Sequence, residues 1–532
     1  MSSALLRNLT IVSVFLLLLG GGPATTSYAG NETRTLKIAD GRGDWGYPNP
    51  FLHYPRGVGY IRMSWVFDTL VWKDESGFIP ALAQEWSYDP EHLAFTFKLN
   101  PKARWHDGEP LTAADVVFTV AYFQKHPYHW VMLDHVKEAK AIDRHTVTIF
   151  LTRPYAPFIS NIGGIMPILP RHIWQEVSDP RNFNEPSAFI GSGPYVFKNF
   201  DQARGSYLYE AFADYYQGRP TAERLIYLRA GQPLVALTGG QADLANIRPE
   251  MAAQLRQRGF EIISDQRGWN KKLMINHRRA PFNERKFRQA LAHAIDRREI
   301  IDRAHRGFGA PASYGLLSVD HPMYNPDTPD YPTDQAKARQ LLEHLGYRAD
   351  AQGYYHRDGR PLKVELLAST ITAAGETAAD RDGEVIRRQL NAVGIRVELV
   401  NLEQATTDSR VRNWQFDLAL SGHGGIGGDP LILVEMISGE VGAGSVNSAR
   451  FDDNPELARL LREQMTAMDP DERRRLVHRI QELHALEVPA IPLYYPDSLA
   501  AYQPAKGVRW FFTPGGIGKG VPIPQNKVSL LP

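Results

Sequence analysis

The sequence predicts an α/β protein of two or three domains, on the basis of two periodicities and its length. Between residues 93 and 151, apolar and polar residues alternate, which is typical of half-buried strands. From residue 283 onward, the apolar residues recur at helical spacing instead. A mature chain of about 500 residues can build its own hydrophobic cores, and chains of that length divide into domains.

In the first region, a helix is predicted between two strands. The runs 93–99 and 147–151 alternate large apolar residues with polar ones. Between them, Thr112 and Asp115 have the spacing of a capping box, in which the hydroxyl accepts from a free backbone N–H and the carboxylate returns to the cap. The apolar residues within 116–121 follow at helical spacing, so we expect a helix to begin here.

The second region mixes helices with strands. One strand–helix–strand succession has the order expected of a crossover between parallel strands. The apolar segment 489–495 near the end of this region could carry the chain back to the first one. The predicted elements are helices at 287–295, 338–345, 384–394, 455–467 and 471–487, and strands at 362–368 and 395–400.

The N-terminal segment predicts export across a membrane. Arg7 precedes an apolar run from Leu9 to Leu19, and Ser27-Tyr-Ala29 offers a small-x-small cleavage site. The apolar run has about 11 residues, whereas a membrane-spanning helix needs roughly 20. We therefore expect a cleavable signal peptide at 1–29 and a soluble mature protein, with an uncleaved anchor as the alternative.

The amino-acid composition limits where the protein is located and which classes of ligand it binds. The chain has no cysteine, which excludes disulfides, thiolate metal sites and a lipid-acceptor cysteine. Without such a cysteine, we expect the exported protein to be released and not tethered to a membrane. With 60 basic and 59 acidic residues and no long run of either sign, nothing indicates binding to nucleic acid or to an anionic surface.

Common enzyme motifs fail when their spacing is checked. The segment Gly515–Gly520 resembles a phosphate loop, but its first required glycine falls on Thr513 and Gly520 replaces the hydroxyl that binds magnesium. Neither Gly-x-Ser-x-Gly nor His-Glu-x-x-His occurs. The start of a calcium loop at Asp380–Gly383 lacks the glutamate that should follow, which favours a turn that leads into a helix.

One histidine-rich segment contains side chains of the kinds that bind metal ions. His126, His129, Asp134 and His135 offer nitrogen and oxygen ligands within ten residues. Their spacing matches no metal motif, and a proline and two aromatic residues lie among them. We expect a solvated loop or a pocket rim here, and no metal or cofactor.

Several segments together resemble the family 5 extracellular solute-binding proteins, which are the peptide, oligopeptide and nickel receptors of ABC importers. The resemblance spans nearly the whole mature chain, and its segments occur in the family's order. They are Phe67–Val71, Ile79–Trp86, Phe95–Leu99, Trp105–Phe118, Gly191–Tyr195, Phe287–Asp296 and Gly428–Pro430.

This resemblance implies a two-lobed periplasmic-binding-protein-like fold, in which lobe I carries a small extra domain and two crossover strands form the hinge. Ligand contacts made by both lobes exist only when the lobes close, so binding shifts the hinge equilibrium. Our candidates for the crossovers are Leu273–Asn276 and Ile491–Tyr495. The expected division is lobe I at 30–69, 188–275 and 494–532, its small domain at 70–187, and lobe II at 276–493.

The residues that anchor the ligand in the family's two branches are missing. In the peptide branch an aspartate four residues before the proline of the Asp-Pro pair holds the free α-amino group, and Ile426 occupies that position here. The nickel branch is similar around Tyr47–His53 and Ile523–Lys527. However, its metal-binding histidine has no equivalent at 431–449, and its chelate-binding arginine has none at 162–167.

The resemblance and the side-chain chemistry give seven hypothetical ligand-binding residues, several of them aromatic. For Asp429, bracing its own loop is the favoured alternative, because Asp-Pro initiates turns. The seven are Trp45, Tyr47, His53, Trp130, Trp269, His423 and Asp429.

The predicted function is that of a monomeric periplasmic receptor for a peptide or peptide-like solute, which it delivers to an ABC permease. A metal chelate is the second candidate ligand. An exported hydrolase or a relative that has lost transport remain alternatives, because catalytic groups that are distant in sequence leave no local motif.

Overall fold

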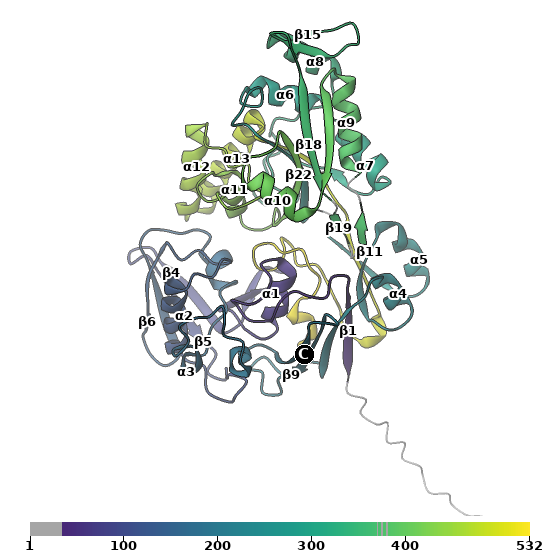
Figure 1. Cartoon of the computed structure of the whole chain (residues 1–532). Helices are drawn as coiled ribbons and strands as arrows, with labels where there is room; N and C mark the ends of the chain where they lie inside the picture. Colours follow the sequence, from purple (N-terminus) through teal and green to yellow (C-terminus); the bar gives the residue numbers. More distant parts are fainter. Residues whose placement is uncertain (1–33, 266, 370, 374–375, 379–380) are drawn as a thin grey trace, which may run out of the picture.

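Three main β-sheets organise the chain. The computed structural model describes residues 34–532 except 266, 370, 374–375 and 379–380; the expected signal peptide, 1–29, lies outside the described residues. Two of the sheets and their helices form two bodies that lie one above the other in Figure 1, and the third sheet belongs to the lower body. We call the lower body lobe I and the upper body lobe II.

Lobe I is built on a seven-stranded mixed sheet. The first strand lies near its centre and is parallel to both of its neighbours, whereas the outer strands pair antiparallel. The order is β12 (Glu261–Asp265), β24 (Ser498–Tyr502), β11 (Leu244–Ile247), β1 (Thr35–Asp40), β10 (Arg224–Arg229), β9 (Ser206–Ala211) and β8 (Tyr195–Asp201). Its helices are α1 (Gly57–Ser64), α4 (Pro233–Thr238) and α5 (Ala252–Gln257).

A four-stranded antiparallel sheet forms the small part of lobe I. The two strands predicted from alternation are paired with each other, and Asp115 accepts the backbone N–H of Thr112 at 2.8 Å, as the capping box predicts. The elements are β4 (Ala83–Asp89), β5 (Ala94–Leu99), β7 (Thr146–Leu151) and β6 (Val136–Ala141), with α2 (Ala113–Lys125) and α3 (Arg171–Trp174). Nearby are the hairpin of β2 (Val71–Lys73) and β3 (Phe78–Pro80), the π-helical Ile159–Gly163 and the 3₁₀ turn Pro186–Phe189.

Lobe II is built on a six-stranded sheet with helices on both faces. Its order is β14 (Ala310–Pro311), β23 (Ala490–Tyr495), β13 (Trp269–Ile275), β22 (Leu418–Gly424), β18 (Lys363–Ser369) and β21 (Arg396–Leu402). One face carries α6 (Arg285–Ala294), α7 (Arg297–His305), α8 (Gln335–His344) and α9 (Asp382–Ala392). The other carries α10 (Gln404–Arg412), α11 (Leu431–Ile437), α12 (Pro455–Thr466) and α13 (Pro470–Glu487).

Lobe II follows the predicted strand and helix order closely. β18 and β21 are parallel over seven residue pairs and are joined through α9, as the predicted crossover requires. The remaining short strands are β15 (Arg348–Ala349), β16 (Tyr355–Arg357), β17 (Arg360–Pro361), β19 (Ile371–Ala373) and β20 (Glu376–Ala378). Short 3₁₀ turns at Pro249–Met251, Pro504–Lys506 and Lys527–Leu530 complete the elements of the described chain.

The chain passes between the lobes at two short connections. One joins β12 of the first sheet to β13 of the second, and the other joins β23 to β24. Both segments predicted as crossovers, 273–276 and 491–495, belong almost entirely to strands of lobe II, because β13 pairs with β22 and β23. We therefore propose that the lobes divide between 265 and 269 and between 495 and 498, whereas the sequence predicts divisions at 275/276 and 493/494.

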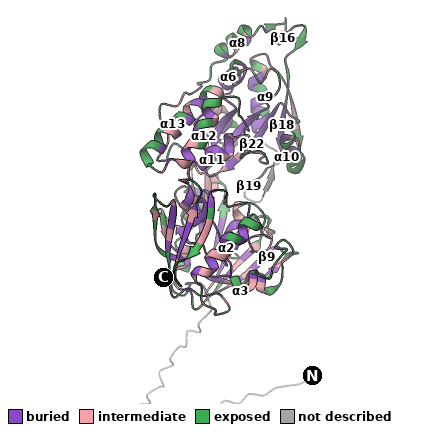
Figure 2. Ribbon diagram, turned by 90° about the vertical axis from the view of Figure 1, so that its left-hand side faces the viewer, coloured by how far each residue is buried: buried purple, intermediate pink, exposed green. Residues whose placement is uncertain are grey.

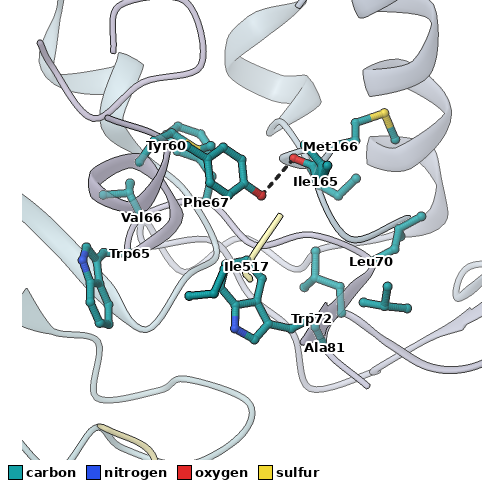
Figure 3. Packing of buried hydrophobic residues seen from close by; sticks show 14 of the residues in the cluster. Tyr60, Trp65, Val66, Phe67, Leu70, Trp72, Ala81, Ile165, Met166 and Ile517 are labelled. Carbon is teal, nitrogen blue, oxygen red and sulfur yellow. Dashed lines mark hydrogen bonds between the residues drawn. The ribbon is translucent and has the colours of Figure 1, made fainter. Parts of the chain in front are cut away.

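Each lobe has its own buried core, and buried residues gather inside each body in Figure 2. The core of lobe I is rich in aromatic side chains, and the Tyr60 hydroxyl donates to the Ile165 carbonyl at 3.2 Å (Figure 3). Ile517 from the C-terminal segment packs into the same core (Figure 3). The last thirty or so residues therefore belong structurally to lobe I, the lobe in which the described chain begins.

None of the helices in the described ranges has the length and apolar character that a membrane crossing requires.

Candidate functional site

Two glycine-rich loops meet where the lobes touch. We call residues 424–428 the lobe II glycine loop and residues 515–520 the C-terminal glycine loop. A Cβ added to Gly520 would lie 2.4 Å from the Cα of Gly425, so the two backbones pack without intervening side chains. Below α10 and α11 in Figure 1, the C-terminal segment reaches up to lobe II at this junction. Glycine is therefore what permits this close approach of the lobes.

Polar contacts also join the lobes in the closed arrangement. Lys519 of the C-terminal glycine loop donates to Glu435 of α11 at 2.8 Å. The backbone N–H of Ala156 donates to the Met465 carbonyl at 2.7 Å. These bonds exist only while the lobes are together, so they stabilise the closed state along with any ligand.

A side chain at Gly427 is expected to hold the lobes apart. A Cβ there would lie 3.2 Å from the Cα of Gly515, and the methyls of valine would reach further across the junction. Gly427→Val should enlarge the radius of gyration measured by X-ray scattering and weaken solute binding about tenfold, because fewer molecules reach the closed state. Gly444→Val is the matched control, since a Cβ there meets nothing within 4 Å. Equal scattering curves for the two variants would contradict this role.

The carboxylate of Asp429 is hydrogen-bonded to neighbouring protein groups. Arg473 donates to both of its carboxylate oxygens at 2.6 and 3.0 Å, and the backbone N–H of Leu431 donates to it at 2.8 Å. The Ser160 hydroxyl of lobe I forms a further hydrogen bond to it. Burial opposes ionisation, but these partners hold the pKa of Asp429 below its usual value. The carboxylate braces its loop and the start of α11, as the alternative interpretation predicted.

Ile426 faces the interior of lobe II. Its side chain is fully buried against Ala312 and Tyr495, and its carbonyl accepts the N–H of Ser318 at 3.0 Å. The position that anchors an α-amino group in the peptide-binding branch is therefore an apolar packing position in this chain.

His423 is a buried polar residue on β22. Neither ring nitrogen has a hydrogen-bond partner among the described residues, although the side chain is almost fully buried. Burial, with the nearby Lys272 and His484, holds the pKa of His423 well below its usual value. The neutral ring therefore offers one donor and one acceptor to anything that enters this part of the fold.

Trp269 and His423 lie on opposite faces of the lobe II sheet. Trp269 pairs with Gly424 and Asn270 pairs with His423, and consecutive residues of a strand point to opposite faces. A Cβ on Gly422 would lie 2.7 Å from Nε1 of Trp269, and a Cβ on Gly424 would also meet the indole ring. The ring therefore covers Gly422 and Gly424 on the sheet face opposite to His423. The 36% exposed Trp269 lies beside the crossover, and it cannot share one pocket with His423.

On the lobe I side, His53 and Trp130 belong to one aromatic cluster. The ring centroids of His53 and Trp130 are 6.2 Å apart, and Trp130 stacks on Tyr60 at 4.8 Å. His53 hydrogen-bonds the Tyr128 hydroxyl at 2.8 Å, and burial lowers the pKa of His53 to about 4. The buried Nε1 of Trp130 has no partner in the described chain.

This aromatic cluster adjoins the lobe junction. A Cβ on Gly518 of the C-terminal glycine loop would lie 3.1 Å from the Tyr60 ring. Lys519 contributes to lowering the pKa of His129 to about 4, after the larger effect of burial. Met132 packs against the α10–α13 core of lobe II. His53 and Trp130 are thus close to the place where the lobes meet.

The Trp45 and Tyr47 side chains contact other residues of lobe I, although the Trp45 carbonyl accepts the N–H of Tyr54, next to His53, at 2.8 Å. The Trp45 indole donates to Asp40 at 2.7 Å, and the guanidinium of Arg42 lies 4.7 Å from its ring. Tyr47 lines a cavity of about 350 Å³ whose other walls, including His106 and Phe189, belong entirely to lobe I. His53, Trp130, His423 and Asp429 therefore lie near the lobe junction, and Trp269 lies on the other face of the lobe II sheet. The Trp45 and Tyr47 side chains contact other residues of lobe I.

The histidine-rich segment of lobe I is divided among separate contacts. His135 stacks on Tyr155 at 4.3 Å, and His126 packs on Tyr122 at 4.7 Å. Within the part of the chain that the structure describes, no three His, Asp or Glu side chains are grouped so that they could hold a metal ion. These histidines pack against aromatic rings in the first lobe.

Three buried residues that the sequence analysis did not select accompany His423. Asn270 and Lys272 of β13 and His484 of α13 lie on its side of the sheet. The sequence contained one signal for two of these residues. The polar run Asn270–Lys272 directly precedes the apolar Leu273–Ile275, and such a polar run is unusual in a central strand.

Comparisons with known proteins agree on one family. A family model described as bacterial extracellular solute-binding proteins, family 5 Middle, matches residues 77–445. Heme-binding protein A of Haemophilus influenzae is 27% identical over 474 residues, which cover 81% of each chain.

Two solved structures have the same fold. The oligopeptide-binding protein AppA of Bacillus subtilis, in complex with a nonapeptide, matches with a TM-score of 0.72 at 22% identity, over 88% of this chain and 94% of that one. NikA of Brucella suis, in complex with Fe(III)-EDTA, matches with a TM-score of 0.77 at 21% identity, over 92% and 100%. Since the family model covers well over half of the sequence, this chain belongs to the family 5 bacterial extracellular solute-binding proteins.

Proposed function

We propose that this chain is the periplasmic receptor of an ABC importer, and that it encloses a peptide or peptide-like solute between its lobes for delivery to a membrane permease. Family membership supports binding of a small solute. The observation that carries the proposal is the junction itself, where buried polar atoms of Trp130 from lobe I and His423 from lobe II lack hydrogen-bond partners among the described residues. Buried polar groups are normally paired, so a solute with donors and acceptors would complete the junction.

The chemistry of the junction favours a solute that is not held through an α-ammonium group. Ile426 is buried in an apolar cluster, and the carboxylate of Asp429 is already bonded to Arg473. The atoms without partners are instead neutral donors and acceptors, including the Asn270 amide and the indole N–H of Trp130. Such groups suit the N–H and C=O groups of a peptide backbone, or of a peptide-like molecule with a blocked or absent amino terminus.

A metal chelate is the second candidate, favoured by the likeness to NikA, whose structure contains Fe(III)-EDTA. Indole N–H and imidazole groups can bind the outer carboxylates of a chelate without touching its metal. In this alternative the protein would supply hydrogen bonds, and the organic ligand would supply the metal's donor atoms.

Native mass spectrometry of the protein purified from its own host tests the proposal. We expect an adduct that is released by denaturation and whose fragmentation shows amide bonds. A metal-containing organic adduct would instead indicate that the transported solute is a metal chelate. Binding of free-amino peptides as tight as that of their N-acetylated forms would contradict the interpretation of Ile426, and hydrolysed fragments accumulating with time would contradict a receptor.

A further inference from the structure

A layer of buried polar side chains lies inside lobe II, between the sheet and the helices that face lobe I. Asn270 and Lys272 alternate along β13, and His423 lies opposite Asn270 on β22. His484 of α13 approaches the same face, close enough to affect the pKa of His423. All four side chains are at least nine-tenths buried. We call these four residues the polar layer.

The polar layer leaves many hydrogen-bonding atoms without partners. Within the described chain, both side-chain polar atoms of Asn270 and both ring nitrogens of His423 have none. Among the described residues, the Lys272 ammonium donates only to the Met436 sulfur, a weak acceptor, at 3.8 Å. His484 donates from Nδ1 to the Tyr314 carbonyl at 2.6 Å, and its Nε2 remains unpaired. Each such group costs free energy unless something else binds it.

The ionisable groups of the polar layer, Lys272, His423 and His484, are all bases. Burial lowers the pKa of Lys272 to about 7. Lys272 in turn lowers the pKa of both His423 and His484, after the larger effect of burial. Within the described chain, Lys272 forms no ion pair, whereas the buried Lys527 of lobe I is paired with Asp68.

The polar layer begins at the lobe junction. Asn270 and His423 form the second residue pair of the β13–β22 ladder, directly after Trp269 and Gly424 at the crossover. Lys272 lies two residues deeper, opposite Ser421, whose hydroxyl bonds Asn447 at 2.8 Å. A group entering from the junction would therefore meet Asn270 and His423 first and Lys272 behind them.

We propose that the polar layer is a carboxylate-binding subsite, in which Lys272, Asn270 and His423 take a carboxylate of the transported solute. The Lys272 ammonium supplies the charge, and the amide and imidazole N–H groups supply two further donors. This inference rests on the proposed function, because the carboxylate belongs to the solute. It selects acidic solutes, or those with a free carboxyl terminus, from the wider class of peptide-like molecules.

Acetate tests the subsite without knowledge of the solute. Sodium acetate, compared with sodium chloride at equal ionic strength, should raise the Tm of the solute-free protein by about 2 °C. Lys272→Met should lose this difference, whereas Lys363→Met, which removes an exposed lysine of the same lobe, should keep it. Equal effects of acetate and chloride, or the same acetate effect in Lys272→Met, would overturn the proposal.

Solute retention provides the second test. Lys272→Met should bind the host-derived solute at least about tenfold more weakly while keeping or raising its Tm, since apolar replacement of an unbalanced buried charge does not destabilise. Equally tight binding of the solute by the wild type and by Lys272→Met would overturn the subsite but leave the receptor function standing. A wild-type protein that never carries solute would contradict the receptor function, while the acetate comparison would still decide the subsite.

Discussion

Lys527→Met is expected to destabilise lobe I by about 3–5 kcal/mol, the usual cost of leaving a buried charge without its partner. Lys527 and Asp68 form an ion pair in which both side chains are almost completely buried, at 2% and 0% exposure. The ammonium also lies 3.9 Å from the Trp72 ring, and two tyrosine hydroxyls donate to Asp68 at 2.8 and 3.0 Å. Urea unfolding followed by tryptophan fluorescence measures the loss.

The double variant Lys527→Met/Asp68→Asn separates charge from packing. Removing both charges should restore part of the lost stability, because no uncompensated carboxylate remains in the core. Lys98→Met, in an exposed pair with Glu85, should leave the unfolding midpoint unchanged. If Lys527→Met also had no effect, the C-terminal segment would not be anchored by this pair.

Acidification below neutral pH is expected to destabilise the protein steeply. Burial lowers the pKa of His53, His106 and His484 to about 4 each. In the unfolded chain these histidines are protonated near their usual pKa of about 6.5, but in the folded chain they are protonated only near pH 4. The stability that their neutral, buried state contributes is therefore fully present above pH 6.5 and is lost as the pH falls toward 4. Each residue then contributes about 3 kcal/mol over that interval.

Urea unfolding at several pH values between 7 and 4.5 measures this dependence. With all three histidines acting, the slope should approach about 4 kcal/mol per pH unit near pH 5. His53→Gln should reduce the slope, because glutamine keeps hydrogen-bonding capacity without titrating. A free energy of unfolding that stays constant from pH 7 to 5 would contradict the burial of these rings.

Secondary structure could be predicted well because its signals are local. The helix after Thr112 and the crossover through α9 each carry their own caps or periodicity, and both occur where expected. The crossover segments between the lobes were harder to predict, because an apolar central strand and an apolar hinge strand have the same sequence pattern. Leu273 and Ile491 turned out to pair within the lobe II sheet.

The candidate site was predicted less completely because it depends on contacts between distant segments. His423 and Trp269 both looked like ligand residues, but the ladder register that separates them onto opposite faces is invisible in a single sequence. Lys272 was missed because a lysine beside another lysine usually indicates a solvated surface. Only the pairing of β13 with β22 shows that it is buried.

The central claim is that a solute bound between the lobes holds them closed. X-ray scattering should be recorded on the protein with its host-derived solute, after removal of that solute by reversible unfolding, and after the extracted solute is added back. We expect the radius of gyration to increase on removal and to return on addition, with Gly427→Val requiring about tenfold more solute to reach the smaller value. A radius of gyration that is the same with and without solute would contradict closure of the lobes around a ligand.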